Sequence, residues 1–196
     1  MESRRHLFCV LAFWLALGSG SVAAQAPHPE ANTPVAVRVD IQDDTVRIYA
    51  ESLVQASMRE VWDVLTDFEN LSRFVSNIAS SKLLSRNGNV LRIAQTGKVG
   101  FGPFTFEFQS TRDMTLTPIE KFESRMVEGN MKRYHGATRL EAAGEGATRI
   151  LFQSEGVPDT ILPLGLMRST IESETREHYL EIAREVLRRK AAAAAR

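Results

Sequence analysis

A histidine near the C-terminal end of the sequence is the clearest candidate for hydrogen-bonding or acid–base chemistry. His178 lies between Ile171 and Ile182 at spacings that place all three near one stripe of a helix. An imidazole at such a position can donate one hydrogen bond to a carbonyl group of a ligand. The alternative is a histidine of the core or its rim with an internal partner. Glu174, one turn earlier, is either that partner or a solvated carboxylate.

Tyr134 and His135 are a second pair of candidates, and they follow each other on a predicted strand. Side chains of consecutive strand residues point to opposite faces of a sheet, so at most one of the two faces inward. Tyr134 shares its parity with Gly136, Thr138 and Leu140, which favours Tyr134 as the inward residue. We therefore expect Tyr134 and Thr138 on the same face.

Motifs of common enzymes and metal sites are missing from the sequence. There is no G-x-S-x-G motif and no pair of histidines at i and i+4. The stretch from Gly97 to Gly102 is not a dinucleotide fingerprint, because Thr105 stands where its last glycine should be. The one cysteine, Cys9, lies in a segment that we expect to be removed, which leaves no thiol for a disulfide, a nucleophile or a metal. We expect no metal and no other cofactor.

The charge balance argues against nucleic acid as a partner. Lys plus Arg and Asp plus Glu both number 24, so the formal net charge is zero, and nothing in the bulk charge attracts nucleic acid. Hydrophobic residues make up 43% of the chain and charged residues 24%, which is typical of a folded globular protein. A chain of 196 residues has room for one ordinary domain and a processed segment.

Phenylalanines mark one face of a predicted strand. Phe104, Phe106 and Phe108 alternate with polar residues, and Phe152 and Met126 lie in neighbouring predicted strands. Such a face either fills a core or lines a cavity, and alternation alone does not separate these two interpretations.

The N-terminal segment has the order of a secretory signal. Arg4 and Arg5 precede an apolar run over 7–17, and small residues follow up to Ala24. This run is well short of the roughly 20 residues that span a bilayer. We expect residues 1–24 to be a cleaved signal peptide, 25–34 a disordered leader, and the mature protein to be periplasmic or secreted. An uncleaved membrane anchor is the alternative.

The elements that must position these residues follow from periodicity. Alternation predicts a hairpin of strands over 35–42 and 45–54. A capping box from Ser57 to Glu60 predicts a helix over 58–66, and Asp67 can cap a second short helix that carries Leu71, Phe74 and Val75. After that, Asn87-Gly88 is a hairpin signal within an antiparallel meander. The predicted strands of the meander cover 82–85, 90–99, 104–109, 122–128, 131–141 and 148–155.

One long amphipathic helix is predicted over 166–190. Met167, Ile171, His178 and Ile182 lie near one stripe, which we expect to be buried against the sheet. Residues 191–196 are expected to form a frayed tail, and the folded domain to cover 35–190.

Three stretches carry a resemblance to a known family. The first runs from Ala56-Ser57 into VWDVLTDF (61–68) and FV (74–75), the second is SSKLLS (80–85), and the third is EGNMKRYHG (128–136). With the element order, they make the chain similar, over residues 45–190, to the START-like (SRPBCC) superfamily. The resemblance is to an exported bacterial member of the polyketide cyclase/dehydrase and coenzyme Q-binding families. Many members have a tryptophan shortly after the equivalent of Gly136, where this chain has Ala137 and Thr138.

The resemblance implies an α+β helix-grip fold, with two short helices after the first strands. A curved antiparallel sheet wraps around the long C-terminal helix, and a cavity lies between the two. It also implies that the cavity binds or transports an apolar small molecule such as a lipid, an isoprenoid quinone or a polyketide-like aromatic. The candidate ligand contacts are Phe104, Phe106, Phe108, Met126, Tyr134, Thr138, Phe152, Met167, Ile171 and His178.

Two other functions stay open. A cyclase- or dehydratase-type enzyme would use Tyr134, His178 or Arg133 as general acid or base in the same cavity. The sequence shows no convergent acid–base pair, which favours binding over catalysis. The third hypothesis is a fully packed interaction domain without a ligand. The expected partners are an apolar small molecule and, transiently, a membrane, but no nucleic acid, and the sequence does not indicate an oligomeric state.

Overall fold

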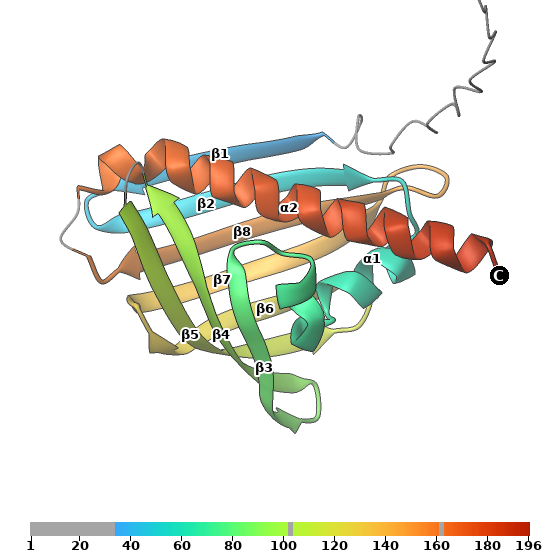
Figure 1. The fold of residues 1–196 in the computed structure, drawn as a ribbon, viewed down its shortest axis with the longest axis horizontal. Coiled ribbons are helices and arrows are strands. Elements are labelled where there is room, and N and C mark those ends of the chain that lie inside the picture. The colour runs from blue at the N-terminus through green and yellow to red at the C-terminus, as the bar shows by residue number, and fades with distance from the viewer. Residues whose placement is uncertain (1–33, 102–103, 161–162) are drawn as a thin grey trace, which may run out of the picture.

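The computed structural model describes residues 34–101, 104–160 and 163–196 (Figure 1). The expected signal peptide (1–24) and nearly all of the expected leader (25–34) lie outside these residues. In chain order the elements are β1 (Val35–Gln42), β2 (Thr45–Val54), α1 (Met58–Leu65), the 3-10 helix η2 (Phe68–Arg73), β3 (Ile78–Asn87), β4 (Val90–Phe101), β5 (Phe104–Thr117), β6 (Lys121–Gly129), β7 (Met131–Ala142), β8 (Thr148–Pro158) and α2 (Leu164–Ala194).

The strands form one antiparallel sheet in the order β1-β2-β8-β7-β6-β5-β4-β3. Strands β3 to β8 are the predicted meander, and β8 closes it by pairing with β2. α1 and η2 connect β2 to β3 at the far edge. Figure 1 shows α2 lying along the face of β1, β2 and β8, while β3, β4 and β5 cross at a steeper angle. Because α2 contacts β1 and β2 as well as β4, the sheet curves around the helix. This arrangement confirms the helix-grip α+β prediction.

Two hairpin turns depend on left-handed backbone. Asp43 joins β1 to β2 with a φ of 54°, and Gly88 joins β3 to β4 with a φ of 59°. Aspartate and glycine are among the residues that adopt this region most readily. The hairpin that the Asn87-Gly88 signal predicts is present, but its turn is shifted by one residue: Asn87 pairs with Val90, so Gly88 and Asn89 are the two turn residues.

The first short helix begins as predicted. The Ser57 backbone N–H donates to Glu60 Oε2 at 2.7 Å, and the Glu60 N–H donates to Ser57 Oγ at 3.3 Å, which completes the capping box. The second short helix is a 3-10 helix that ends at Arg73, before Phe74 and Val75. Asp67 is its N-cap residue but makes no side-chain capping bond there. The Asp67 carboxylate instead accepts hydrogen bonds from Asn70 and Arg189.

The long helix is buried in its C-terminal half. Tyr179, Ile182, Ala183 and Val186 are each at most 5% exposed. Met167 and Ile171, from the earlier part of the predicted stripe, are only half-buried. The helix continues through Ala194 in the structure, so fraying of the 191–196 tail stays a prediction. In the part of the chain that the structure describes, no helix is long and apolar enough to cross a membrane.

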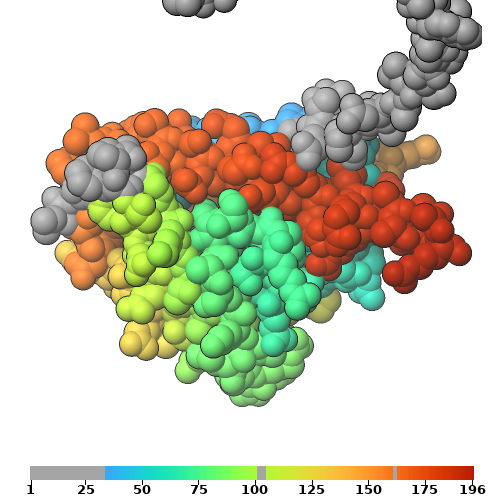
Figure 2. All heavy atoms as spheres, in the orientation of Figure 1, coloured from blue at the N-terminus to red at the C-terminus, as the bar shows by residue number. Residues whose placement is uncertain are grey.

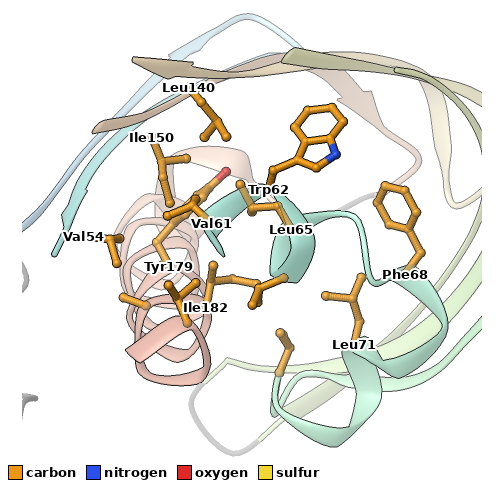
Figure 3. Close-up of a cluster of buried hydrophobic side chains, with 14 of the residues drawn as sticks. Val54, Val61, Trp62, Leu65, Phe68, Leu71, Leu140, Ile150, Tyr179 and Ile182 are labelled. Carbon is orange, nitrogen blue, oxygen red and sulfur yellow. The ribbon is translucent and has the colours of Figure 1, made fainter. Parts of the chain in front are cut away.

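The core lies where α1 is held between α2 and the sheet. Figure 3 shows side chains of α1 meeting residues from η2, α2 and the strands. Trp62 and Phe68 both pack edge-to-face on the ring of Phe122, with centroids 6.3 and 5.9 Å apart. This packing fills one end of the space between helix and sheet, and the other part of that space remains hollow.

Candidate functional site: a cavity between sheet and helix

A cavity of about 270 Å³ lies between the inner face of the sheet and α2. Every strand from β2 to β8 contributes to its lining, together with α1, η2 and α2. Much of the lining is apolar, and burial of such surface against a ligand is favourable. Apolar lining residues include Ile48, Leu65, Ile93, Phe122, Phe152 and Ile182.

Aromatic side chains organise the part of the cavity next to α2. The rings of Phe152 and Tyr179 pack with centroids 5.8 Å apart, which links β8 to the helix. His178 packs edge-to-face on Tyr179, with a centroid distance of 5.4 Å. These contacts hold the neighbouring side chains His178 and Tyr179 beside the cavity.

Tyr134 enters the cavity lining because the neighbouring inward residue is glycine. A Cβ atom on Gly136 would lie 2.7 Å from the Tyr134 hydroxyl oxygen, too close for unstrained contact. Gly136 therefore leaves the room that the Tyr134 hydroxyl occupies. His135 faces the opposite side of the sheet and is exposed, as the parity of β7 predicts.

Arg112 brings a positive charge to this largely apolar space. Its Nη2 donates to Oε1 of Gln95, which is 3% exposed, and the amide of Gln95 in turn donates to Ser81 Oγ at 3.0 Å. The guanidinium carbon lies 5.8 Å from the centroid of the Tyr134 ring. The buried Nε of Arg112 finds no acceptor among the described residues. A neutral amide thus positions the guanidinium without neutralising it.

Two groups of the cavity are held in their neutral forms. Burial lowers the pKa of His178 to about 4, and the positive charge of Arg112 lowers it further in the same direction. The His178 side chain is half-buried, borders the cavity and packs on the ring of Tyr179. Burial also raises the pKa of Tyr179 well above its ordinary range, although a hydrogen bond with Thr138 acts against this shift. Near neutral pH the cavity therefore offers an imidazole and a phenol without charge.

The rim of the cavity joins α2 to the segment before β3. The Asn77 amide donates to Glu174 Oε2 at 3.2 Å, and the Ser76 N–H donates to Glu181 Oε2 at 3.0 Å. Figure 2 shows α2, in orange to red, meeting the green segment of α1, η2 and β3 on the same face. Glu174 thus borders the cavity while bound to Asn77, not to His178 as one reading of the sequence allows.

The structure brings four of the predicted ligand contacts together around the cavity: Tyr134, Thr138, Phe152 and His178. Two of the acid–base candidates, Tyr134 and His178, are among them. The third, Arg133, is exposed and donates to Thr45 Oγ1 at 3.2 Å, so it does not border this cavity.

The remaining candidates lie elsewhere. Phe106 and Phe108 share the inward face of β5 with Arg112, but they lie farther along the strand, and the ring of Phe108 packs over Gly97. Met126 borders a separate hollow along β6 and β7. Met167 and Ile171 precede the helical turns that reach the cavity, and the side chain of Phe104 lies outside the described part. A ligand role stays a prediction for all ten candidates, including the four that border the cavity.

Three residues that sequence reasoning missed belong to the lining: Gln95, Arg112 and Tyr179. Arg112 lies at the same strand parity as Phe108 and Met114, so the sequence already places a charged side chain on the inward face of this strand. That unusual placement was the signal that could have identified Arg112 as a candidate. Tyr179 precedes Ile182 by three residues and therefore lies on the same helix face.

The fold and the cavity define the class of this protein: a helix-grip domain with an internal ligand-sized space. Residues 54–181 match the family model described as polyketide cyclase / dehydrase and lipid transport, and the chain belongs to that family. The family and the structural neighbours place it in the START/SRPBCC superfamily.

Solved structures agree with this assignment at the level of the fold. The Zhui aromatase/cyclase from Streptomyces sp. R1128 is 16% identical, with a TM-score of 0.66 over 76% of this chain and 98% of that one. A STAR-related lipid transfer protein from Xanthomonas axonopodis is 14% identical, with a TM-score of 0.63 over 78% and 93%. Human STARD10 is 13% identical, with a TM-score of 0.61 over 80% and 72%. No curated protein sequence matches the chain.

Proposed function

We propose that this protein binds or transports an apolar small molecule in the cavity between the sheet and α2. The observation that carries the proposal is the cavity itself, about 270 Å³ of space with Phe122, Phe152 and Ile182 in its lining. Protein interiors are close-packed, and few of their voids exceed the size of a water molecule. A space this large therefore favours a ligand over the packed interaction domain.

The volume restricts the size of the ligand. A water molecule takes up about 30 Å³ in the liquid, and a methylene group is of similar size, so about 270 Å³ corresponds to roughly nine such groups. One alkyl chain or a small ring system fits this space, whereas a lipid with two long chains does not. Among the ligand classes that the family resemblance implies, a small aromatic or a single-chain molecule fits best.

Binding is favoured over catalysis by the state of the cavity groups. A general base works best when its pKa lies near the operating pH. The pKa of His178, lowered to about 4 by burial and by Arg112, makes its imidazole a weak base at neutral pH. Tyr179 is correspondingly a weak acid, because burial raises its pKa. The names of the structural neighbours include both a lipid transfer protein and an aromatase/cyclase. For this chain, the uncharged side chains of His178 and Tyr179 favour ligand binding over catalysis.

We also propose that the protein is exported. The order of charged, apolar and small residues over 1–24 supports this proposal. A cavity protein outside the cytoplasm would collect its ligand from, or deliver it to, a membrane surface or the surrounding fluid.

The test of ligand binding has two parts. Native mass spectrometry of protein purified from its host should show a co-purifying apolar mass. In addition, the protein should bind a fluorescent single-chain fatty-acid analogue, and the Thr175→Trp variant should bind it at least tenfold more weakly, because Thr175 borders the cavity and a tryptophan there fills it.

Ser173→Trp is the matched control, since Ser173 lies on the same helix but is exposed and outside the lining. It should bind the analogue like the wild type. If the wild type carries no apolar mass and binds none of a panel of apolar probes, the packed interaction domain replaces the carrier.

A further inference from the structure

Arg112 borders the cavity without an anionic partner among the described residues. Its guanidinium borders the cavity, is fixed by the neutral amide of Gln95, and faces the ring of Tyr134. Its Nε is buried and has no acceptor among the described residues. Buried hydrogen-bond donors are nearly always paired, so an unpaired one bordering a cavity points to an acceptor on the ligand.

The other charged group of the lining is already engaged. Among the described residues, Arg112 and Glu174 are the charged side chains that border the cavity. Glu174 accepts from Asn77 at the rim, and no carboxylate of the described chain lies within ion-pair distance of Arg112. Buried cations are normally paired, because desolvation of an isolated charge is costly. His178 does not compensate the charge, since a neutral imidazole carries none.

We infer that the ligand is an amphipathic monoanion whose carboxylate pairs with Arg112 while its apolar part lies against Phe122, Phe152 and Ile182. The inference rests on the proposed binding function and names the class of ligand. A carboxylate accepts from the N–H donors of a guanidinium with matching planar geometry. A single cation balances one negative charge, which favours a carboxylate over a doubly charged phosphate ester.

A matched series of single-chain probes tests this inference: decanoate, decanol and decyltrimethylammonium, each measured by titration calorimetry at pH 7.5. The chains are the same length, so the head group alone differs. Wild-type protein should bind decanoate about tenfold or more tightly than decanol, because hydrogen bonds to a charged group are stronger than those between neutral groups. Decyltrimethylammonium should bind weakest.

Arg112→Gln should remove the preference for decanoate over decanol, because it removes the charge that distinguishes the two probes. Arg112→Lys keeps the positive charge and should retain part of the preference. Circular dichroism and thermal melting of each variant show whether it is folded, and the wild-type comparison of the three probes needs no variant at all.

The outcomes separate the two proposals. If wild-type protein binds decanol and decanoate equally, or if a folded Arg112→Gln variant keeps the preference, the carboxylate inference is wrong and the binding function stands. If no member of this series and no other apolar probe binds, both proposals are wrong.

Discussion

At the scale of single residues, Arg112 and His178 determine the electrostatic character of the cavity together. Each borders the same space, and the positive charge of Arg112 adds to burial in disfavouring a second positive charge on His178. The cavity thus keeps one cation and a neutral imidazole near pH 7. In the inference made above, the anionic head group would therefore meet a single cation, Arg112, in this cavity.

The first prediction concerns the pH dependence of stability. The pKa of His178 is about 4 in the folded protein and about 6.5 in the unfolded chain, so the unfolded chain takes up a proton first as the pH falls. The contribution of His178 to the free energy of unfolding is therefore fully present above pH 6.5 and is lost between pH 6.5 and 4. The full loss would be about 3 kcal/mol, and water in the cavity beside the ring reduces it.

Urea unfolding of the wild type and of His178→Gln at several pH values between 7.5 and 4 measures this loss. The variant should lose less stability over that interval, since glutamine does not titrate. Carboxylates with lowered pKa values, such as Glu60 beside Ser57, contribute equally to both proteins and cancel in the comparison. Parallel curves for the two proteins would show that His178 is not held neutral by the fold.

The second prediction concerns a glycine on β4. A Cβ atom on Gly97 would collide with the backbone oxygen of Asn77 and with the ring of Phe108, whereas Gly100 has open space around it. Gly97→Ala should therefore lower the free energy of unfolding by about 1–3 kcal/mol, a typical effect of overpacking. Gly100→Ala on the same strand is the control and should be close to neutral. Chemical denaturation of both variants measures the difference, and equal stabilities would contradict the close approach.

Residue roles could be predicted from the sequence where parity or spacing decides them. Tyr134 faces the cavity and His135 faces away because strand geometry alternates. Arg112 could not be assigned in the same way, since an arginine at an inward position is compatible with either a bulge or an exposed strand end. Its role depends on Gln95, which the pairing of β4 with β5 brings beside it.

At the scale of elements, the stability of the curved sheet depends on its contacts with α2. The helix packs against α1 and β1, and Arg189 in its last turns connects it to Asp67 at 2.7 Å, just before η2. The same arginine and Arg188 hydrogen-bond to Glu185, which is 8% exposed. The helix thus joins the short helices to the sheet through both apolar and charged contacts.

The third prediction tests this dependence. Ile182 is 1% exposed, so Ile182→Asp forces a carboxylate into an apolar interface. The cost is several kcal/mol against a total stability of about 5–15 kcal/mol, and the domain should unfold or melt far below the wild type. Ser173→Asp places the same group on an exposed position of the same helix and should leave the melting temperature nearly unchanged. A wild-type melting curve for Ile182→Asp would mean that this face of α2 does not support the fold.

The element order and most boundaries follow from sequence signals, and the departures have local causes. The hairpin of β1 and β2 and the capping box of α1 are where periodicity and capping chemistry place them. The second short helix begins after Asp67 as predicted but ends at Arg73, before Phe74 and Val75, and the Asp67 side chain bonds to Asn70 and Arg189 in place of a backbone N–H of the helix. β3 begins at Ile78, earlier than its apolar alternation indicates, because an irregularity between Ile78 and Ser80 interrupts the period of two.

At the scale of the whole molecule, the domain and the N-terminal segment lead to a fourth prediction. Protein recovered from its host should lack Met1 to Ala24, because the segment has the order of a cleaved signal peptide. Intact-mass spectrometry of the cell-envelope and extracellular fractions measures this directly. A full-length product retained in the membrane would support the anchor and contradict the proposed export.

The cavity itself could be predicted only through the family resemblance. Alternating phenylalanines are equally compatible with a filled and a hollow interior, since packing depends on how the sheet curves around α2. The curvature comes from the pairing of distant strands and the helix that crosses them, none of which is a local property of the sequence. The structure places the hollow beside Tyr134 and Phe152 and not along Phe106 and Phe108.

The two irregularities in β3, between Ile78 and Ser80 and between Leu83 and Ser85, have a consequence for behaviour at high concentration. β3 is the last strand of the sheet, and a regular free edge is a template on which strands of other molecules can add. Each register shift interrupts the row of backbone donors and acceptors that such an added strand would need. This edge is therefore a poor starting point for aggregation, although Leu84, at the second register shift of β3, is 55% exposed.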